Sequence, residues 1–216
     1  MISNFMILGD SYSTHKDFIP EGYRHYYCTG GRSAEEPVTN MLPEQTWWGR
    51  LIKATGARLV LNNSWSGSTI GYTGYTGDCS HSNSFIYRYR QLLESGFFEK
   101  EKIDTIFVFG GTNDSWCNAP LGEETYGVWQ ESDLFKVRPA ICHLLSGIKK
   151  NHPDKRVIVI GNCDIKAEVT ECLKNAAAHV GAEYLGLVDI DKQKGHPTVL
   201  GMEQIFLQVY RFLNSK

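Results

Sequence analysis

The sequence of 216 residues lacks the features that mark several large classes of protein. No apolar stretch is long enough to span a bilayer, and the amino terminus lacks the basic region and cleavage site of a signal peptide. Charge of one sign is not in excess either, because 22 basic and 24 acidic residues give a formal net charge of -2. We therefore expect a soluble protein with no nucleic-acid or membrane partner. A cytoplasmic location is the default expectation, unless an export signal was removed from the chain.

Cysteine is present, but not in the patterns of zinc-binding proteins. The six cysteines include no CxxC pair and no Cys/His spacing typical of zinc sites. We expect free, mostly buried thiols, and a disulfide among Cys28, Cys79 and Cys117 only if the protein is secreted. No strand is followed by a GxGxxG turn, which argues against a nucleotide. The sequence thus predicts no metal and no organic cofactor.

The chain does contain a regular alternation of apolar, β-rich runs with segments of helical period. The expected strands are residues 5–8, 59–62, 105–109, 156–160 and 183–188, and the expected helices are residues 45–55, 86–94, 134–150, 166–180 and 201–214. Continuous apolar strands separated by helices predict a parallel sheet covered on both faces. The length, with 42% hydrophobic residues, fits a single domain over residues 1–216.

Two long segments do not fit this alternation. Residues 12–44 and 115–131 are rich in glycine, proline and aromatic residues, and each follows the end of a predicted strand. Loops at the carboxyl ends of parallel strands are where α/β proteins build their binding sites. We interpret both segments as insertions that form walls of a pocket.

Four short polar segments also follow predicted strands. They are GDSYS at 9–13, NSWSGST at 63–69, GGTND at 110–114 and GHPTVLGM at 195–202. Ser11 stands where a buried strand reaches the surface, and a serine hydroxyl needs a base such as His196 to act as a nucleophile. Each segment alone is a common turn or helix start, so the prediction rests on their order and spacing.

This order of segments resembles the SGNH (GDSL-like) hydrolase family, and the resemblance extends from Gly9 to the last helix. It implies a three-layer α/β/α sandwich of the flavodoxin-like kind, with a five-stranded parallel sheet. It further implies that Ser11 is the nucleophile and His196 the base, and that Gly67 and Asn113 help to bind the oxyanion. The backbone N–H of Ser11 is a third oxyanion donor. The implied activity is hydrolysis of a carboxylic ester.

One position departs from the family pattern. The family usually has an aspartate three residues before the histidine, where this chain has Gln193. A glutamine cannot stabilise an imidazolium as a carboxylate does. Asp191 is the first candidate for the missing acid and Asp189 the second, and both residues are equally compatible with surface or turn positions. Without either acid, the site would operate as a Ser–His dyad.

The substrate is indicated only by aromatic residues near the four segments. Trp65, Trp116 and Tyr12 are candidates for substrate binding, although the same rings could instead pack the insertions onto the sheet. Flat rings with polar edges suit sugars, whereas a lipase pocket would need an aliphatic run. We expect a small acyl ester, with deacetylation of a carbohydrate as the preferred reaction. The alternatives are a lipase or thioesterase, and a degenerate protein that binds a glycan or partner without turnover. The sequence does not indicate the oligomeric state.

Overall fold

The apolar strands direct side chains to both faces of one sheet because successive residues of a strand point in opposite directions. In the first strand, Phe5 and Ile7 join one buried cluster, while Met6 and Leu8 join another on the opposite face. The computed structural model describes residues 2–215. Its five parallel strands are β1 (Asn4–Gly9), β2 (Arg58–Ser64), β5 (Thr105–Phe109), β6 (Arg156–Gly161) and β7 (Glu183–Gly186), in the order β2-β1-β5-β6-β7.

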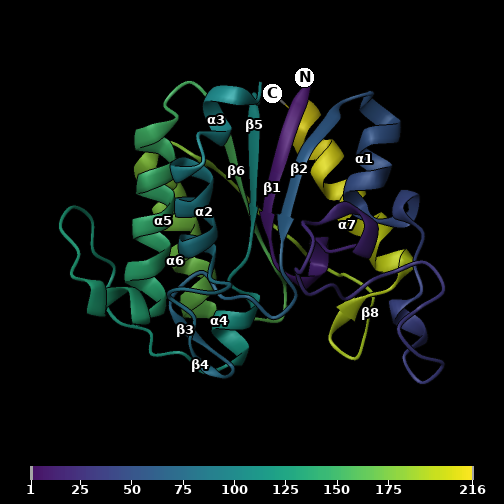
Figure 1. The fold of residues 1–216 in the computed structure, drawn as a ribbon, viewed down its shortest axis with the longest axis horizontal. Coiled ribbons are helices and arrows are strands. Elements are labelled where there is room, and N and C mark those ends of the chain that lie inside the picture. The colour runs from purple at the N-terminus through teal and green to yellow at the C-terminus, as the bar shows by residue number, and fades with distance from the viewer. Residues whose placement is uncertain (1, 216) are drawn as a thin grey trace.

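Helices cover both faces of this sheet (Figure 1). On one face lie α2 (Phe85–Glu94), α5 (Val137–Asn151) and α6 (Ala167–Val180), and on the other lie α1 (Trp47–Thr55) and α7 (Val199–Asn214). Two short helices, α3 (Phe97–Lys100) and α4 (Thr112–Trp116), follow α2 and β5. The predicted three-layer α/β/α sandwich with a five-stranded, flavodoxin-like parallel sheet is confirmed.

The element boundaries differ from prediction where side chains or turns override periodicity. Helix α7 begins at Val199 rather than at Gly201, because the Thr198 hydroxyl accepts the backbone N–H of Gly201. The expected helix 134–150 divides into a 3₁₀ turn (Glu131–Phe135) and α5. Two antiparallel hairpins were not predicted: β3 (Thr73–Gly74) with β4 (Gly77–Asp78), and β8 (Lys192–Gln193) with β9 (His196–Pro197).

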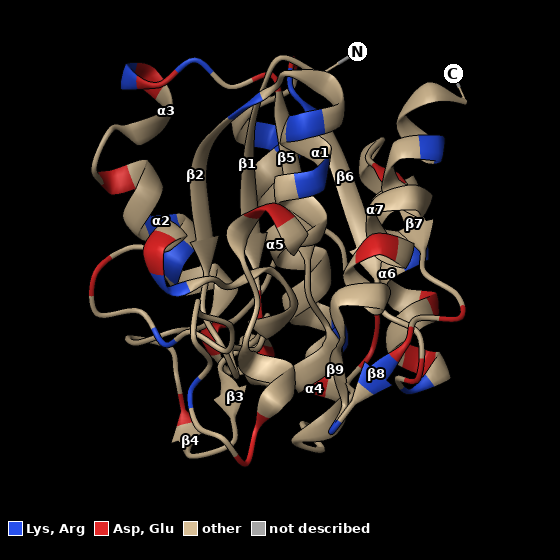
Figure 2. Cartoon of the chain, turned by 90° about the vertical axis from the view of Figure 1, so that its right-hand side faces the viewer, with Lys and Arg blue, Asp and Glu red and all other residues tan. Residues whose placement is uncertain are grey.

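The loops at the carboxyl ends of the parallel strands gather at one end of the fold. Figures 1 and 2 show α4 and the two hairpins at this end, away from the two termini. The segment 12–44 is ordered by short 3₁₀ turns and packs Tyr26, Tyr27 and Met41 into the cluster shared with α1 and α7. All six cysteines are free thiols in the structure. Within residues 2–215, no helix has the length and apolar character to cross a membrane.

Candidate active site

The end of β1 presents Ser11 on a tight turn. Asp10 accepts the backbone N–H of Tyr12 with its Oδ1 at 3.0 Å, and this contact caps a 3₁₀ turn that begins at Ser11. The Nε2 atom of His196 lies 3.0 Å from the Oγ atom of Ser11. Residues 185 positions apart are therefore in hydrogen-bond contact, at the distance expected for a nucleophile and its base.

The second ring nitrogen of His196 determines its tautomer. Nδ1 lies 3.1 Å from the main-chain carbonyl of Lys194, and a carbonyl can only accept a hydrogen bond. A neutral imidazole must therefore carry its proton on Nδ1, which leaves the lone pair of Nε2 facing the Ser11 hydroxyl. Burial lowers the pKa of His196, and the bond to Lys194 acts in the opposite direction. Burial is the larger of the two effects, so the lowered pKa favours a neutral ring that is ready to accept a proton.

The β8–β9 hairpin holds His196 in this orientation. Its two turn residues, Lys194 and Gly195, have φ values of 50° and 76°, as in the tight two-residue turns that suit twisted hairpins. Tyr12 donates its hydroxyl to the Gly195 carbonyl at 2.6 Å, and Tyr27 donates to the Pro197 carbonyl at 2.8 Å. The turn that carries the histidine is therefore tied to the segment that follows Ser11.

Contacts from two further segments complete this support. The ammonium group of Lys192 donates to Asn162 Oδ1 at 3.1 Å and to Asp164 at 3.0 Å, which anchors β8 to the loop after β6. The ring of Tyr26 stacks on the imidazole of His196, with 3.6 Å between centroids and 8° between planes. Sequence reasoning missed Tyr26. The only signal was the crowding of aromatic residues in segment 12–44, which did not distinguish it from its neighbours.

The expected oxyanion donors lie beside the same serine. Gly67 has a φ of 84°, a conformation that favours glycine and turns its backbone out of line with β2. The side-chain amide of Asn113, in α4, donates to the Ser68 carbonyl at 2.9 Å, while its Oδ1 accepts the Tyr75 hydroxyl at 3.1 Å. These two contacts fix the orientation of the amide. Its second N–H has no acceptor among residues 2–215, so it can donate to a ligand.

A buried carboxylate holds the loop that follows Gly67. Asp114 accepts the backbone N–H of Ile70 at 2.9 Å and that of Gly71 at 3.1 Å. Burial raises the pKa of this carboxyl to about 6 even though these hydrogen bonds favour its charged form. Asp114 thus anchors the loop that follows a different strand, β2.

Neither candidate acid contacts His196. Asp191 accepts the Thr198 hydroxyl on Oδ2 and uses its own backbone N–H to bond Gln204 at 2.6 Å. Asp189 is exposed and has a φ of 51°. Asp191 therefore belongs to the start of α7, and the position behind the imidazole is filled by the Lys194 carbonyl. In this arrangement the imidazole of His196 lies between the Ser11 hydroxyl and a main-chain acceptor.

The three aromatic candidates occupy different positions. Trp116 lies in the wall of the cleft around Ser11. Trp65 packs at a tilt against Tyr23, with 4.5 Å between centroids, and it lines a smaller neighbouring pocket instead. Tyr12 is fully buried beneath the His196 turn, so it cannot touch a substrate. Its hydrogen bond to the Gly195 carbonyl assigns it to the support of the histidine.

The cleft around Ser11 has a volume of about 340 Å³. It is lined by Ser11, Arg24, Tyr26, Arg32, Ser66, Gly67, Tyr75, Asn113, Trp116 and His196. None of these side chains is aliphatic. The cleft therefore brings a serine hydroxyl, an imidazole and N–H donors together within a wall of polar and aromatic side chains. Within residues 2–215, no group of three or more His, Cys, Asp or Glu side chains is placed to hold a metal ion.

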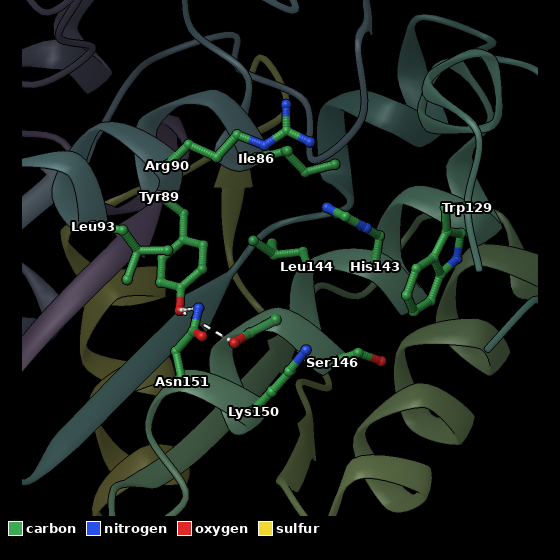
Figure 3. Close-up of a pocket in the computed structure, with 11 residues that line it drawn as sticks. Ile86, Tyr89, Arg90, Leu93, Trp129, His143, Leu144, Ser146, Lys150 and Asn151 are labelled. Carbon is green, nitrogen blue, oxygen red and sulfur yellow. Dashed lines mark hydrogen bonds between the residues drawn. The ribbon is translucent and has the colours of Figure 1, made fainter. Parts of the chain in front are cut away.

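A groove of similar volume lies between α2 and α5 and shares no lining residue with the cleft around Ser11 (Figure 3). Its floor is apolar, and Trp129 and His143 stand together at one side. No hydrogen bond joins His143 to a hydroxyl group in the described part of the chain, and its Nδ1 is unpaired. The groove thus lacks a serine–histidine contact like the one in the cleft around Ser11.

An α/β sandwich with a serine–histidine pair and amide donors at its strand ends defines the class of serine hydrolases with this fold. A family profile described as GDSL-like Lipase/Acylhydrolase matches residues 3–213. The chain therefore belongs to the GDSL-like lipase/acylhydrolase family. The family resemblance predicted from the sequence is confirmed.

Solved structures support this placement. A GDSL-like protein of Bacteroides uniformis ATCC 8492 is 40% identical with a TM-score of 0.89, over 100% of this chain and 97% of that one. One from Bacteroides ovatus ATCC 8483 is 37% identical with a TM-score of 0.89, over 100% of both chains. A family two carbohydrate esterase of Cellvibrio japonicus shares the fold at 14% identity and a TM-score of 0.62, over 98% of this chain and 62% of that one. None of the curated proteins compared with the chain matches it.

Proposed function

We propose that this protein is a serine esterase that removes a small acyl group, preferably acetyl, from a carbohydrate. The observation that carries this proposal is the 3.0 Å contact between Ser11 Oγ and His196 Nε2 in a cleft that also contains Gly67 and Asn113. Family membership supports hydrolysis of an acyl bond. The roles of the individual residues and the choice of substrate are our inference from the geometry.

The reaction follows from the proton positions. As Ser11 Oγ attacks the ester carbonyl, its proton passes to Nε2 of His196, and the carbonyl oxygen becomes an oxyanion. The backbone N–H groups of Ser11 and Gly67 and the free N–H of Asn113 would stabilise that charge. Collapse of this intermediate expels the alcohol, which takes the proton from Nε2. Water then attacks the acyl-serine by the same route and releases the carboxylic acid.

The main-chain acceptor behind His196 is sufficient for the base to work. The Lys194 carbonyl keeps the proton on Nδ1, so Nε2 stays available to Ser11. A carbonyl dipole stabilises the imidazolium less than a carboxylate would. The aromatic ring of Tyr26, stacked on the imidazole, offsets part of this deficit through its negative π face. We therefore propose a Ser11–His196 dyad in place of the triad.

The lining of the cleft favours a small acyl group on a sugar. The wall of the cleft has no aliphatic side chain, and its apolar surface comes from aromatic rings, so a long acyl chain finds no aliphatic groove to cover it. The rings of Tyr26, Tyr75 and Trp116 provide flat faces and polar edges, which suit a sugar ring. Neighbours with the same fold include proteins described as carbohydrate esterases, and this points in the same direction. A lipase activity is the weaker alternative.

The test is hydrolysis of 4-nitrophenyl esters of increasing acyl length, followed by acetate release from acetylated sugars. We expect turnover of the acetyl ester, a loss of rate with longer chains, and no turnover by Ser11→Ala. Ser146→Ala is the matched control, because Ser146 lines the remote groove between α2 and α5. Failure of an organophosphonate to label Ser11, together with no release of acetate, would instead favour a protein that binds a glycan without turnover.

A further inference from the structure

The cleft around Ser11 contains two arginines and no acidic side chain among the residues that line it. A site that binds only a neutral ester needs no cation in its wall. A concave surface with charge of one sign focuses the electrostatic field and raises the local concentration of an oppositely charged ligand. Arg24 and Arg32 therefore need an explanation beyond the hydrolysis of an acetyl group.

Arg24 is positioned beside the expected oxyanion donors but has no partner for its charge. Its backbone carbonyl accepts the N–H of Ser66 at 2.8 Å, which fixes Arg24 next to the residue that precedes Gly67. Its side chain is exposed, and within residues 2–215 no hydrogen bond or ion pair engages its guanidinium. The five donors of this group are thus available to a ligand in the cleft.

Arg32 reaches the cleft from the side of the base. Its guanidinium carbon lies 5.8 Å from the centroid of the Tyr26 ring, and Tyr26 stacks on His196. An ion pair with Glu36 is long, at 3.7 Å, and both side chains are more than a third exposed. Such a pair contributes little and is readily exchanged for another anion. The two arginines therefore offer guanidinium groups on the two sides of the Ser11–His196 pair.

We propose that Arg24 and Arg32 form an anion-binding subsite, and that the substrate is an acyl ester of an acidic sugar. This inference rests on the proposed function, because it assigns the arginines to the alcohol part of the ester. A carboxylate matches the planar fork of a guanidinium and accepts two parallel hydrogen bonds from it. A sugar carboxylate is thus the preferred group, and a sugar sulfate carries the same charge in a different geometry.

The experiment compares acetate release from mono-O-acetyl glucuronic acid and mono-O-acetyl glucose, which differ in a carboxylate in place of a hydroxymethyl group. We expect the wild type to have the higher kcat/KM for the acid, with a KM that rises with ionic strength. Arg24→Gln and Arg32→Gln should each reduce the acid-to-neutral ratio of kcat/KM by about tenfold. Glu36→Gln should increase that ratio by freeing Arg32. The kcat/KM for a sulfated acetyl glucose shows whether the subsite prefers a carboxylate or a sulfate.

Arg211→Gln, on the exposed face of α7, is the control and should leave both rates as they are. Equal kcat/KM values for the acid and the neutral sugar, or a ratio that neither arginine variant alters, would overturn the subsite while the esterase stands. If the wild type hydrolyses neither ester, the proposed function fails. The affinities of Ser11→Ala for glucuronic acid and for glucose then test the subsite directly. Equal affinities for the two sugars, or a preference for the acid that Arg24→Gln leaves unchanged, overturn the subsite.

Discussion

At the scale of single residues, the main-chain carbonyl behind His196 separates this site from a carboxylate-assisted triad. Asp191 bonds Thr198, while the ring nitrogens of His196 contact Lys194 and Ser11. We expect Asp191→Asn to keep kcat/KM within about threefold of wild type, because a change that removes no transition-state contact alters the barrier little. The variant should melt at a lower temperature, since it weakens the start of α7. Steady-state kinetics and thermal unfolding measure the two effects.

Asp189→Asn is the matched control for this prediction. Asp189 has a φ of 51°, a conformation that asparagine also adopts readily, and it is exposed. The Asp189→Asn variant should therefore have the kcat/KM and the melting temperature of the wild type. A loss of about a thousandfold in kcat for Asp191→Asn in a folded protein would contradict the dyad and restore the acid to the mechanism.

The protonation of His196 gives a second prediction at this scale. Burial disfavours the imidazolium, so the pKa of His196 lies below its ordinary value of 6.5. The base must be neutral, and kcat/KM should rise with pH to a plateau, with a midpoint below 6.5. The profile with 4-nitrophenyl acetate measures this midpoint. A midpoint above 6.5 would mean that an anionic group supports the imidazolium after all.

At the scale of elements, the β8–β9 hairpin determines where His196, the proposed base, lies. Gly195 has a φ of 76°, and an added Cβ would lie 3.1 Å from Cη2 of Trp116. We expect Gly195→Ala to cost about 1 kcal/mol of stability from the left-handed backbone. It should also lower kcat by roughly tenfold or more, because the turn that carries His196 must shift. Chemical denaturation and steady-state kinetics report these two effects separately.

Gly181→Ala supplies the control for the hairpin. Gly181 has a φ of 70° at the end of α6, and an added Cβ would meet nothing within 4 Å. The Gly181→Ala variant should lose about as much stability as Gly195→Ala and keep the kcat of the wild type. Equal kcat values in the two variants would show that the hairpin tolerates displacement and does not set the position of the base.

The elements also show which features the sequence could predict. The parallel strands were found because fully buried strands form continuous apolar runs, and Thr105–Phe109 was located with its correct ends. The β8–β9 hairpin has two residues in each strand, too few for a period to be visible. The acceptor behind His196 could not be predicted at all, since every residue type has a backbone carbonyl and only the fold selects Lys194.

At the scale of the whole molecule, contacts between distant segments also leave little trace in the sequence. The order of the polar segments predicted that Ser11 and His196 meet, because loops after parallel strands gather at one edge. The stacking of Tyr26 on His196 depends on how segment 12–44 folds back across that edge. Such packing follows from the complete tertiary structure and leaves no local pattern in the sequence.

Arg88 is the residue that connects the segments of the site through the core, and it gives the last prediction. It lies fully inside the protein on α2, and burial lowers its pKa to about 10, so it remains charged at neutral pH. Its guanidinium donates to the Gly9 carbonyl at 3.1 Å and to Ser68 Oγ at 3.0 Å, and also to both oxygens of Asn63 and to the Asn83 carbonyl. All five donors of the group are used.

Replacing Arg88 should therefore affect the entire fold. Arg88→Met removes the guanidinium donors of the Gly9 and Asn63 carbonyls, and Gly9 keeps the backbone N–H of Trp65 at 3.1 Å. We expect a loss of about 3–5 kcal/mol in the free energy of unfolding. Urea denaturation measures this loss, and Arg211→Met on the surface should stay within about 0.5 kcal/mol of wild type. Arg88→Lys keeps the charge but not the planar fork, so it should recover only part of the stability. A loss below about 1 kcal/mol in Arg88→Met would mean that water replaces the guanidinium, and that the segments around Ser11 are held together by the sheet alone.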